Sequence, residues 1–139
     1  MIRIKKKISI IAPAKINLNL NVKKKDKGGL HFLESQVCFI NLYDTIYLSE
    51  DNITSISQLT NKSNFIIKDE TLLLKSLERF KIRFNWKKNF KVTFEKNIPI
   101  GAGLGGGSAD AAAILLGLKI LYNHENPNKK ISQKEILDL

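Results

Sequence analysis

The chain has 139 residues, of which 43% are hydrophobic and 26% charged, a composition typical of one globular domain rather than of a disordered chain. No apolar run reaches the length of about 18 residues that a membrane-spanning helix needs, and a single cysteine, Cys38, excludes an internal disulfide and a cysteine-rich metal site. The net charge is +10, but only three arginines are present and the lysines lie in separate clusters. We therefore predict a generally basic surface, no membrane association, no nucleic-acid-binding face and a cytoplasmic location.

The first third of the chain is predicted to form β-strands. Residues 15–22 alternate isoleucine, leucine or valine with lysine or asparagine, and this period of two predicts a half-buried strand. Residues 31–42 are rich in valine, phenylalanine and isoleucine and are expected to form a second strand region. A short strand is expected over residues 45–48, and Asp44 before it is expected to lie in a turn.

The middle of the chain changes to a helical period over residues 69–84. Asp69 and Glu70 suit the N-terminal end of this helix, both as capping residues and as partners of the helix dipole. The apolar stripe consists of Leu73, Leu77, Phe80 and Phe84. Alternation returns over residues 90–94, which predicts another half-exposed strand.

Two further helices are predicted in the last third of the chain. One begins near Ser108, after a glycine-rich loop, and continues to about Tyr122. Ser132 and Glu135 have the spacing of a capping box, so a second helix is expected to begin there. Its apolar pattern stops after about two turns, short of the ~12 residues at which helices become stable alone, so we expect a C-terminally truncated chain rather than a frayed natural end.

The glycine-rich loop is the most informative segment for chemistry. Residues 99–113 read PIGAGLGGGSADAAA and contain five of the eight glycines in the chain. Glycine tolerates positive φ, and successive backbone amides at the start of a helix bind phosphate groups, so we predict an anion site rather than a flexible turn. No lysine follows the glycines, which excludes a Walker A loop, and the GxGxxG pattern is only a weak match to a dinucleotide fold.

Together with APAKINLNL over residues 12–20, this loop resembles the motifs of the GHMP kinases, and among them the family that phosphorylates 4-diphosphocytidyl-2-C-methyl-D-erythritol. The resemblance implies an α+β fold like the second domain of ribosomal protein S5, with a mixed sheet and helices on one face. It implies that residues 1–139 are an incomplete N-terminal ATP-binding domain and that a C-terminal substrate domain is absent.

The resemblance also implies a reaction, in which ATP and Mg²⁺ phosphorylate the 2-hydroxyl of 4-diphosphocytidyl-2-C-methyl-D-erythritol in non-mevalonate isoprenoid synthesis. Lys15 matches the catalytic lysine, Asn17 and His31 match substrate-binding residues, and Ser108 is a possible Mg²⁺ ligand. The residues that match the ATP-phosphate loop are Pro99, Ile100, Gly101, Ala102, Gly103, Leu104, Gly105, Gly106, Gly107, Ser108 and Ala109.

Two departures from the family pattern bear on function. Leu30 stands where the family has a tyrosine that stacks on the cytosine, and the family's Gly-Ala-Asp-Val-Pro motif with its catalytic aspartate does not occur. By the spacing of the motifs, that aspartate is expected beyond residue 139, and Asp110 in the phosphate helix is no obvious substitute. The alternatives are another GHMP kinase such as homoserine kinase, an inactive remnant, and a basic RNA-binding module.

Overall fold

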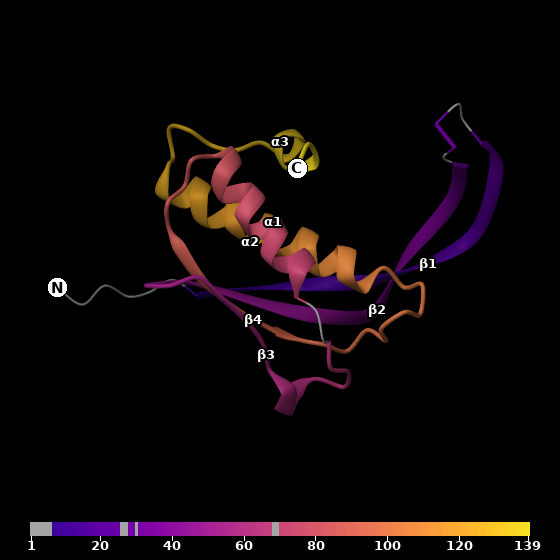
Figure 1. The fold of residues 1–139 in the computed structure, drawn as a ribbon, viewed down its shortest axis with the longest axis horizontal. Coiled ribbons are helices and arrows are strands. Elements are labelled where there is room, and N and C mark those ends of the chain that lie inside the picture. The colour runs from indigo at the N-terminus through magenta and orange to yellow at the C-terminus, as the bar shows by residue number, and fades with distance from the viewer. Residues whose placement is uncertain (1–6, 26–27, 30, 68–69) are drawn as a thin grey trace.

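The computed structural model describes residues 7–25, 28–29, 31–67 and 70–139. Asp69 and Leu30, to which the sequence analysis assigns roles, lie outside the described residues. Figure 1 shows the elements in chain order, which are β1 (Lys7–Lys25), β2 (His31–Asp51), β3 (Ser55–Gln58), the 3₁₀ turn η1 (Thr60–Lys62), α1 (Thr71–Arg83), β4 (Asn89–Glu95), α2 (Gly106–Glu125) and α3 (Gln133–Leu137).

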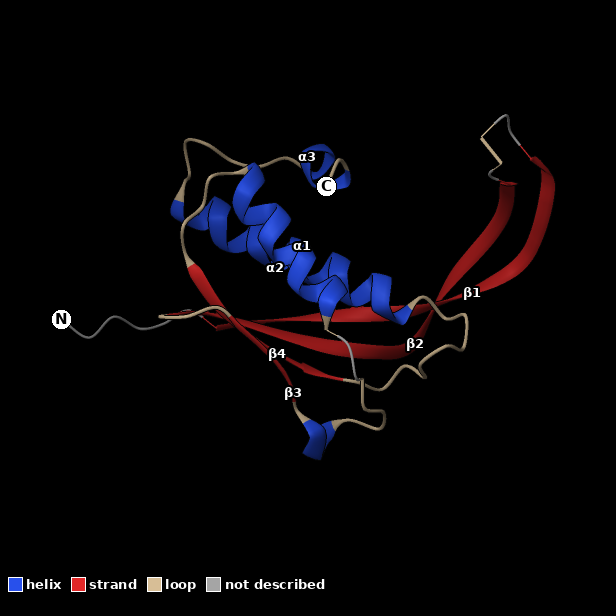
Figure 2. Ribbon diagram, viewed as in Figure 1, coloured by secondary structure: helices blue, strands red, loops and turns tan. Residues whose placement is uncertain are grey.

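One sheet carries the fold, with strands in the order β1-β2-β4-β3. The β1–β2 and β2–β4 pairs are antiparallel, whereas β3 runs parallel to β4, so the sheet is mixed. All three α-helices lie on one face of this sheet (Figure 2). The α+β architecture predicted from the sequence is therefore confirmed.

The hydrophobic core lies between the sheet and helices α1 and α2. From the sheet, β4 turns Phe90, Val92 and Phe94 inward, and the intervening residues face away. From α1, Leu77 and Phe80 are fully buried, which confirms the predicted helical stripe. Among the described residues, no helix combines the length and the apolar character needed to cross a membrane.

Helix α2 approaches the sheet closely because of a glycine. A Cβ atom at Gly117 would stand 2.6 Å from Cδ1 of Ile10 on β1 and 3.4 Å from Cδ1 of Leu48 on β2. The absence of a side chain at this position lets the helix backbone rest on the two strands. Helix α2 is thereby held directly above the part of β1 that leads to Lys15.

The ends of the helices correct two predictions and confirm one. Helix α1 begins at Thr71, and its N-cap residue Glu70 makes no side-chain capping hydrogen bond, so the predicted capping by Glu70 was wrong. Helix α2 begins at Gly106, two residues before the predicted start near Ser108. The capping box of α3 is present, with the amide of Glu135 donating to Oγ of Ser132 over 3.2 Å.

The outer halves of β1 and β2 form a two-stranded ribbon that projects from the body (Figure 1). We call this ribbon, residues 17–25 and 31–39, the β-arm. Leu18, Leu20 and Val22 are all exposed, so the prediction of a half-buried strand over residues 15–22 was wrong beyond Ile16. The alternation is real, but no described layer of the chain covers the apolar side.

Asp44 lies inside β2 and not in a turn, contrary to the sequence prediction. The strand runs without interruption through this position, and the side chain is 0% exposed. An aspartate is tolerated inside a strand here because its carboxylate is fully engaged. It accepts hydrogen bonds from the ammonium of Lys96 and from the backbone amides of Asn97 and Ile98.

Candidate active site

The loop between β4 and α2 has the backbone conformation of an anion-binding nest. Gly101, Gly103 and Gly105 have φ angles of 76°, 73° and 72°, so every second residue adopts the left-handed conformation. Alternation of this kind turns successive amides toward the same side of the chain. The space beside Cα of Gly101 and Gly103 is open for 4 Å, so a ligand can approach the backbone there.

The N-terminus of α2 adds donors to the same place. The helix has 20 residues, its N-cap is Gly105, and no side chain caps its first amides. These amides have no partner within the helix, and the helix dipole gives this end a partial positive charge. Loop and helix together therefore present backbone N–H groups toward one anion.

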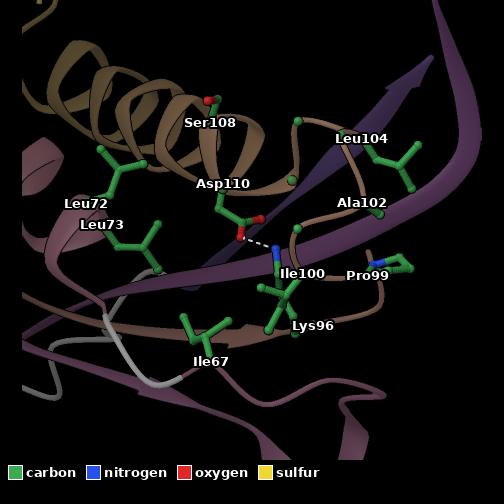
Figure 3. A pocket seen from close by; sticks show the side chains of 15 residues that line it. Ile67, Leu72, Leu73, Lys96, Pro99, Ile100, Ala102, Leu104, Ser108 and Asp110 are labelled. Atoms are coloured by element: carbon green, nitrogen blue, oxygen red, sulfur yellow. Dashed lines mark hydrogen bonds and ion pairs between the residues drawn. The ribbon is translucent and has the colours of Figure 1, made fainter. Parts of the chain in front are cut away.

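A cavity of about 400 Å³ opens beside the loop, and Figure 3 shows the side chains that line it. Ile67, Leu72 and Leu73 form an apolar wall opposite the glycines. Gln58, at the end of β3, holds Ile67 in place. The backbone amide of Ile67 donates a hydrogen bond to Oε1 of Gln58 over 3.0 Å. The cavity can therefore hold a molecule with one apolar end and one phosphate end.

Lys15 of β1 lies against this loop. Its backbone amide donates to the carbonyl of Leu104 over 3.0 Å, and its side chain runs across Gly105, where a Cβ atom would be 3.2 Å from Cγ of the lysine. The ammonium donates to Oδ1 of Asn17 over 3.2 Å. The structure thus brings the predicted catalytic lysine, the predicted substrate residue Asn17 and the phosphate loop together.

Ser35 belongs to the same cluster and was missed from the sequence. Its hydroxyl lies 3.2 Å from Oδ1 of Asn17 and donates to the backbone carbonyl of Asn19. Position 35 pairs with Leu20 of β1 in the register of the β-arm. The contact could not be predicted from the sequence. The pairing of β1 with β2 shifts between Pro13 and Lys15 and again between Asn17 and Asn19, and the sequence pattern does not indicate these shifts.

His31 lies at the other end of the β-arm. It pairs with Lys25, and its Nδ1 is 3.2 Å from the carbonyl oxygen of Lys23. Because β2 has period two, His31 shares a face with Ser35 and with Phe39, the partner of Lys15. The predicted substrate residues therefore follow one face of the β-arm, with His31 farther from the glycine loop than Asn17.

Ser108 is the third residue of α2 and stands at the rim of the cavity. In Figure 3 its side chain points away from that of Asp110. In the part of the chain that the structure describes, no three His, Cys, Asp or Glu side chains gather around a possible metal position. A magnesium ion here would fit as an ion held by the Ser108 hydroxyl and by the phosphates it accompanies.

A buried ion cluster underlies the loop. The ammonium of Lys96 donates to Oδ2 of Asp44 over 2.5 Å and to Oδ2 of Asp110 over 2.7 Å. The sequence contains a signal for it, because the inward alternation of Phe90, Val92 and Phe94 continues to position 96. An inward-facing lysine predicts a buried carboxylate partner.

Burial raises the pKa of Asp110 to about 7, and the neighbouring ammonium of Lys96 only partly opposes this rise. Burial also disfavours the charged form of Lys96, but its hydrogen bonds to Asp110 and Asp44 raise the pKa of the ammonium above its usual value. Lys96 is therefore protonated throughout the physiological range, and the carboxyl group of Asp110 changes its protonation near neutral pH.

Comparison with known proteins agrees with these features. Residues 71–139 match the family model described as the GHMP kinases N terminal domain. A 4-diphosphocytidyl-2-C-methyl-D-erythritol kinase of Clostridium tetani is 39% identical over 127 residues, which are 91% of this chain and 45% of the relative. The kinase of the same name from Listeria innocua is 43% identical over 120 residues, 84% of this chain and 40% of the relative.

Solved structures show the same fold. The crystal structure of a 4-(cytidine 5'-diphospho)-2C-methyl-D-erythritol kinase superposes with a TM-score of 0.68 at 30% identity, over 83% of this chain and 41% of that one. Homoserine kinase from Cytophaga hutchinsonii superposes with a TM-score of 0.66 at 17% identity, over 99% of this chain and 41% of that one, which shows the fold alone.

The chain thus spans less than half the length of the curated relatives it matches. Over that length the chain is similar in sequence to these relatives and shares its fold with the solved kinase structure. The chain belongs to the GHMP kinases and has the fold of their N-terminal domain.

Proposed function

We propose that the chain is the nucleotide-binding part of a small-molecule kinase that acts on 4-diphosphocytidyl-2-C-methyl-D-erythritol. ATP would bind with its phosphates in the glycine loop and its base against the apolar wall of the cavity. The single observation that supports this most is the position of Lys15, whose side chain crosses Gly105. A cation beside an anion-binding loop suits the transfer of a phosphoryl group to a neighbouring hydroxyl.

The proposed roles follow from the contacts. Lys15 acts as a point charge that stabilises the attacking oxygen or the transferring phosphoryl group. Asn17 orients Lys15, since its Oδ1 accepts from the ammonium. A bound Mg²⁺ ion would neutralise charge that develops on the phosphates, and Ser108 would hold it. His31, on the same face of the β-arm, would hydrogen-bond the cytosine of the substrate.

The identity of the substrate rests on the relatives. Several proteins that are 39–43% identical to the chain carry the name 4-diphosphocytidyl-2-C-methyl-D-erythritol kinase. We propose the same acceptor, the 2-hydroxyl of that compound, and a role in the non-mevalonate route to isoprenoids. The proposal includes a cytoplasmic location, where ATP and Mg²⁺ are at hand.

We further propose that residues 1–139 act as an N-terminal ATP-binding domain, and that the catalytic aspartate is supplied from beyond residue 139. Loss of a general base costs about 10²–10⁴-fold in rate. We therefore expect the chain alone to bind nucleotide weakly and to turn over negligibly. Transfer of labelled phosphate from ATP at an ordinary kinase rate by this chain alone would contradict this part of the proposal.

The nucleotide site is tested by calorimetric titration of ATP with Mg²⁺ into the full chain. Lys15→Met is expected to weaken binding about 10-fold, since one charge-assisted contact is worth about 1.5–3 kcal/mol. Lys23→Met is the matched control, because it removes the same charge from the β-arm, where Lys23 pairs with Glu34. No ATP binding by the wild-type chain, or equal losses in the two variants, would overturn the proposal.

The substrate is tested separately, by titrating 4-diphosphocytidyl-2-C-methyl-D-erythritol and homoserine into the chain in the presence of ADP. The first compound is expected to bind and the second not, with His31→Ala weakening binding of the first by roughly 10-fold through loss of one hydrogen bond to the cytosine. Preference for homoserine would instead favour a different GHMP kinase.

A further inference from the structure

Three charged side chains from three elements meet beneath the glycine loop. They are Asp44 of β2, Lys96 just after β4 and Asp110 of α2, and their side chains are 0%, 4% and 2% exposed. Figure 3 shows the link between Lys96 and Asp110 as a dashed line. Withdrawing ions from water costs several kcal/mol for each, and the hydrogen bonds of Lys96 to Oδ2 of Asp44 and Oδ2 of Asp110 offset part of that cost, while Oδ1 of Asp110 is buried without a hydrogen-bond partner among the described residues.

The cluster reaches both ends of the loop. At the entry, Oδ1 of Asp44 accepts the backbone amides of Asn97 and Ile98, the latter over 2.8 Å. At the exit, Asp110 is the fifth residue of α2, the helix into which the loop runs. Because Lys96 bonds both carboxylates, the two ends of the loop are joined through one ammonium group.

Gly106, the first residue of α2, rests directly on this cluster. A Cβ atom there would stand 3.1 Å from Nζ of Lys96 and 3.0 Å from Cγ2 of Ile98. The backbone of the first helical turn is therefore in contact with the ammonium that bridges the loop ends.

We propose that Lys96 and Asp110 are positioning residues of the phosphate site: their hydrogen bond holds the first turn of α2 against the entry of the glycine loop. The inference rests on the proposed function, in which this loop binds nucleotide phosphates. It predicts that the hydrogen bond between the two side chains strengthens binding of the phosphates of a nucleotide but does not affect binding of its base and ribose. The base would lie against Ile67, Leu72 and Leu73, whereas Lys96 and Asp110 line the same cavity beneath the glycine loop.

The test compares Asp110→Asn with Asp110→Leu in the full chain. Both variants remove the carboxylate charge, but only asparagine keeps the shape of aspartate and an oxygen that accepts a hydrogen bond from Lys96. Equilibrium binding of ADP and of adenosine, which lacks phosphates, is measured for each by ligand-detected NMR. We expect ADP to bind Asp110→Leu about 10-fold more weakly than Asp110→Asn, while adenosine affinity differs by less than about 2-fold.

A second variant covers the case in which Asp110→Leu does not fold. Gly106→Ala leaves all three charges in place and inserts a methyl group between α2 and Lys96. It is expected to weaken ADP binding and to spare adenosine binding.

The outcomes separate the two proposals. Failure of wild-type protein to bind ADP overturns the proposed nucleotide site itself. If the wild type binds ADP and the asparagine and leucine variants bind it equally, the positioning role is wrong and the site stands. Equal loss of ADP and adenosine affinity in Asp110→Leu also overturns it, because the cluster would then support the whole cavity and not the phosphate loop.

Discussion

Gly105 combines a backbone conformation and a close contact that no other residue can reproduce. Its φ is 72°, and a Cβ atom would be 3.2 Å from Cγ of Lys15. We expect Gly105→Ala to lower the free energy of unfolding by about 1–2 kcal/mol through the left-handed conformation alone, and to displace the lysine. Chemical denaturation measures the stability.

Gly107→Ala is the control for this prediction. Gly107 lies in the first turn of α2 without a positive φ, and its Cβ position has no neighbour within 4 Å. Alanine is a better helix former than glycine, so Gly107→Ala is expected to leave stability unchanged or to raise it by about 0.5–1 kcal/mol. Equal destabilisation by both substitutions would contradict the role assigned to Gly105.

Asp110 makes stability depend on pH in an unusual direction. Its pKa is raised to about 7 in the folded chain, from 3.8 when exposed, chiefly by burial. Between pH 4 and 7 the unfolded chain therefore releases a proton that the folded chain keeps, and this lowers the free energy of unfolding as pH rises. Urea denaturation of the wild type and of Asp110→Asn at pH 5 and pH 7 measures the effect.

From pH 5 to pH 7, the free energy of unfolding of the wild type is expected to fall by about 2–3 kcal/mol more than that of Asp110→Asn. Each pH unit over which only the folded chain keeps the proton lowers this free energy by up to about 1.4 kcal/mol. Groups other than Asp110 titrate alike in both proteins and cancel in the comparison. The same pH dependence in both proteins would show that Asp110 is ionised when folded.

At the scale of the element, α1 depends on a single buried stripe. Leu77 is 0% exposed, whereas Leu74 on the same helix is 39% exposed. We expect Leu77→Ala to cost about 2–5 kcal/mol, because it removes core contacts and leaves a cavity. Leu74→Ala makes the same change in helix propensity but is expected to lower the free energy of unfolding by less than about 1 kcal/mol. Thermal unfolding of the two variants measures the difference, and equal losses would contradict the described packing of the helix.

The β-arm is expected to be the least protected part of the sheet. It is a two-stranded ribbon with both faces exposed, and such ribbons are marginal without a covering layer. Amide hydrogen exchange followed by mass spectrometry should therefore be at least about 10-fold faster over residues 32–37 than over residues 45–49, which lie between β1 and β4. Equal protection of the two segments would contradict this.

Sequence periodicity predicted elements well where a neighbour covers them. The stripe of α1 and the inward residues of β4 are confirmed because helix and sheet bury each other's apolar sides. The same alternation over residues 15–22 was misleading, since a pattern of period two shows which side is apolar and not whether anything covers it. Asp44 was assigned to a turn by residue preference, which tertiary contacts with Lys96 override.

At the scale of the whole molecule, the candidate site is assembled from segments far apart in the sequence. The glycine loop was predicted from composition, and Lys15 and Asn17 were assigned from the family motif. Ser35 and Lys96 were missed, because one depends on the register of two strands and the other on a buried partner that lies about 50 residues away. Local pattern therefore predicts the loop and gives a signal that Lys96 faces inward, but the partners of Ser35 and Lys96 are found only from the fold.

The bond from the Lys15 amide to the Leu104 carbonyl has a consequence for biosynthesis. Ribosomes add about 5–20 residues per second, so roughly 4–18 s separate the synthesis of these two residues, about 90 positions apart. During that interval the nascent β1 has β2 as a partner but no loop to join. The site for the anion therefore cannot close before α1 and β4 have been synthesised, whereas α2 and α3 follow Leu104 in the chain.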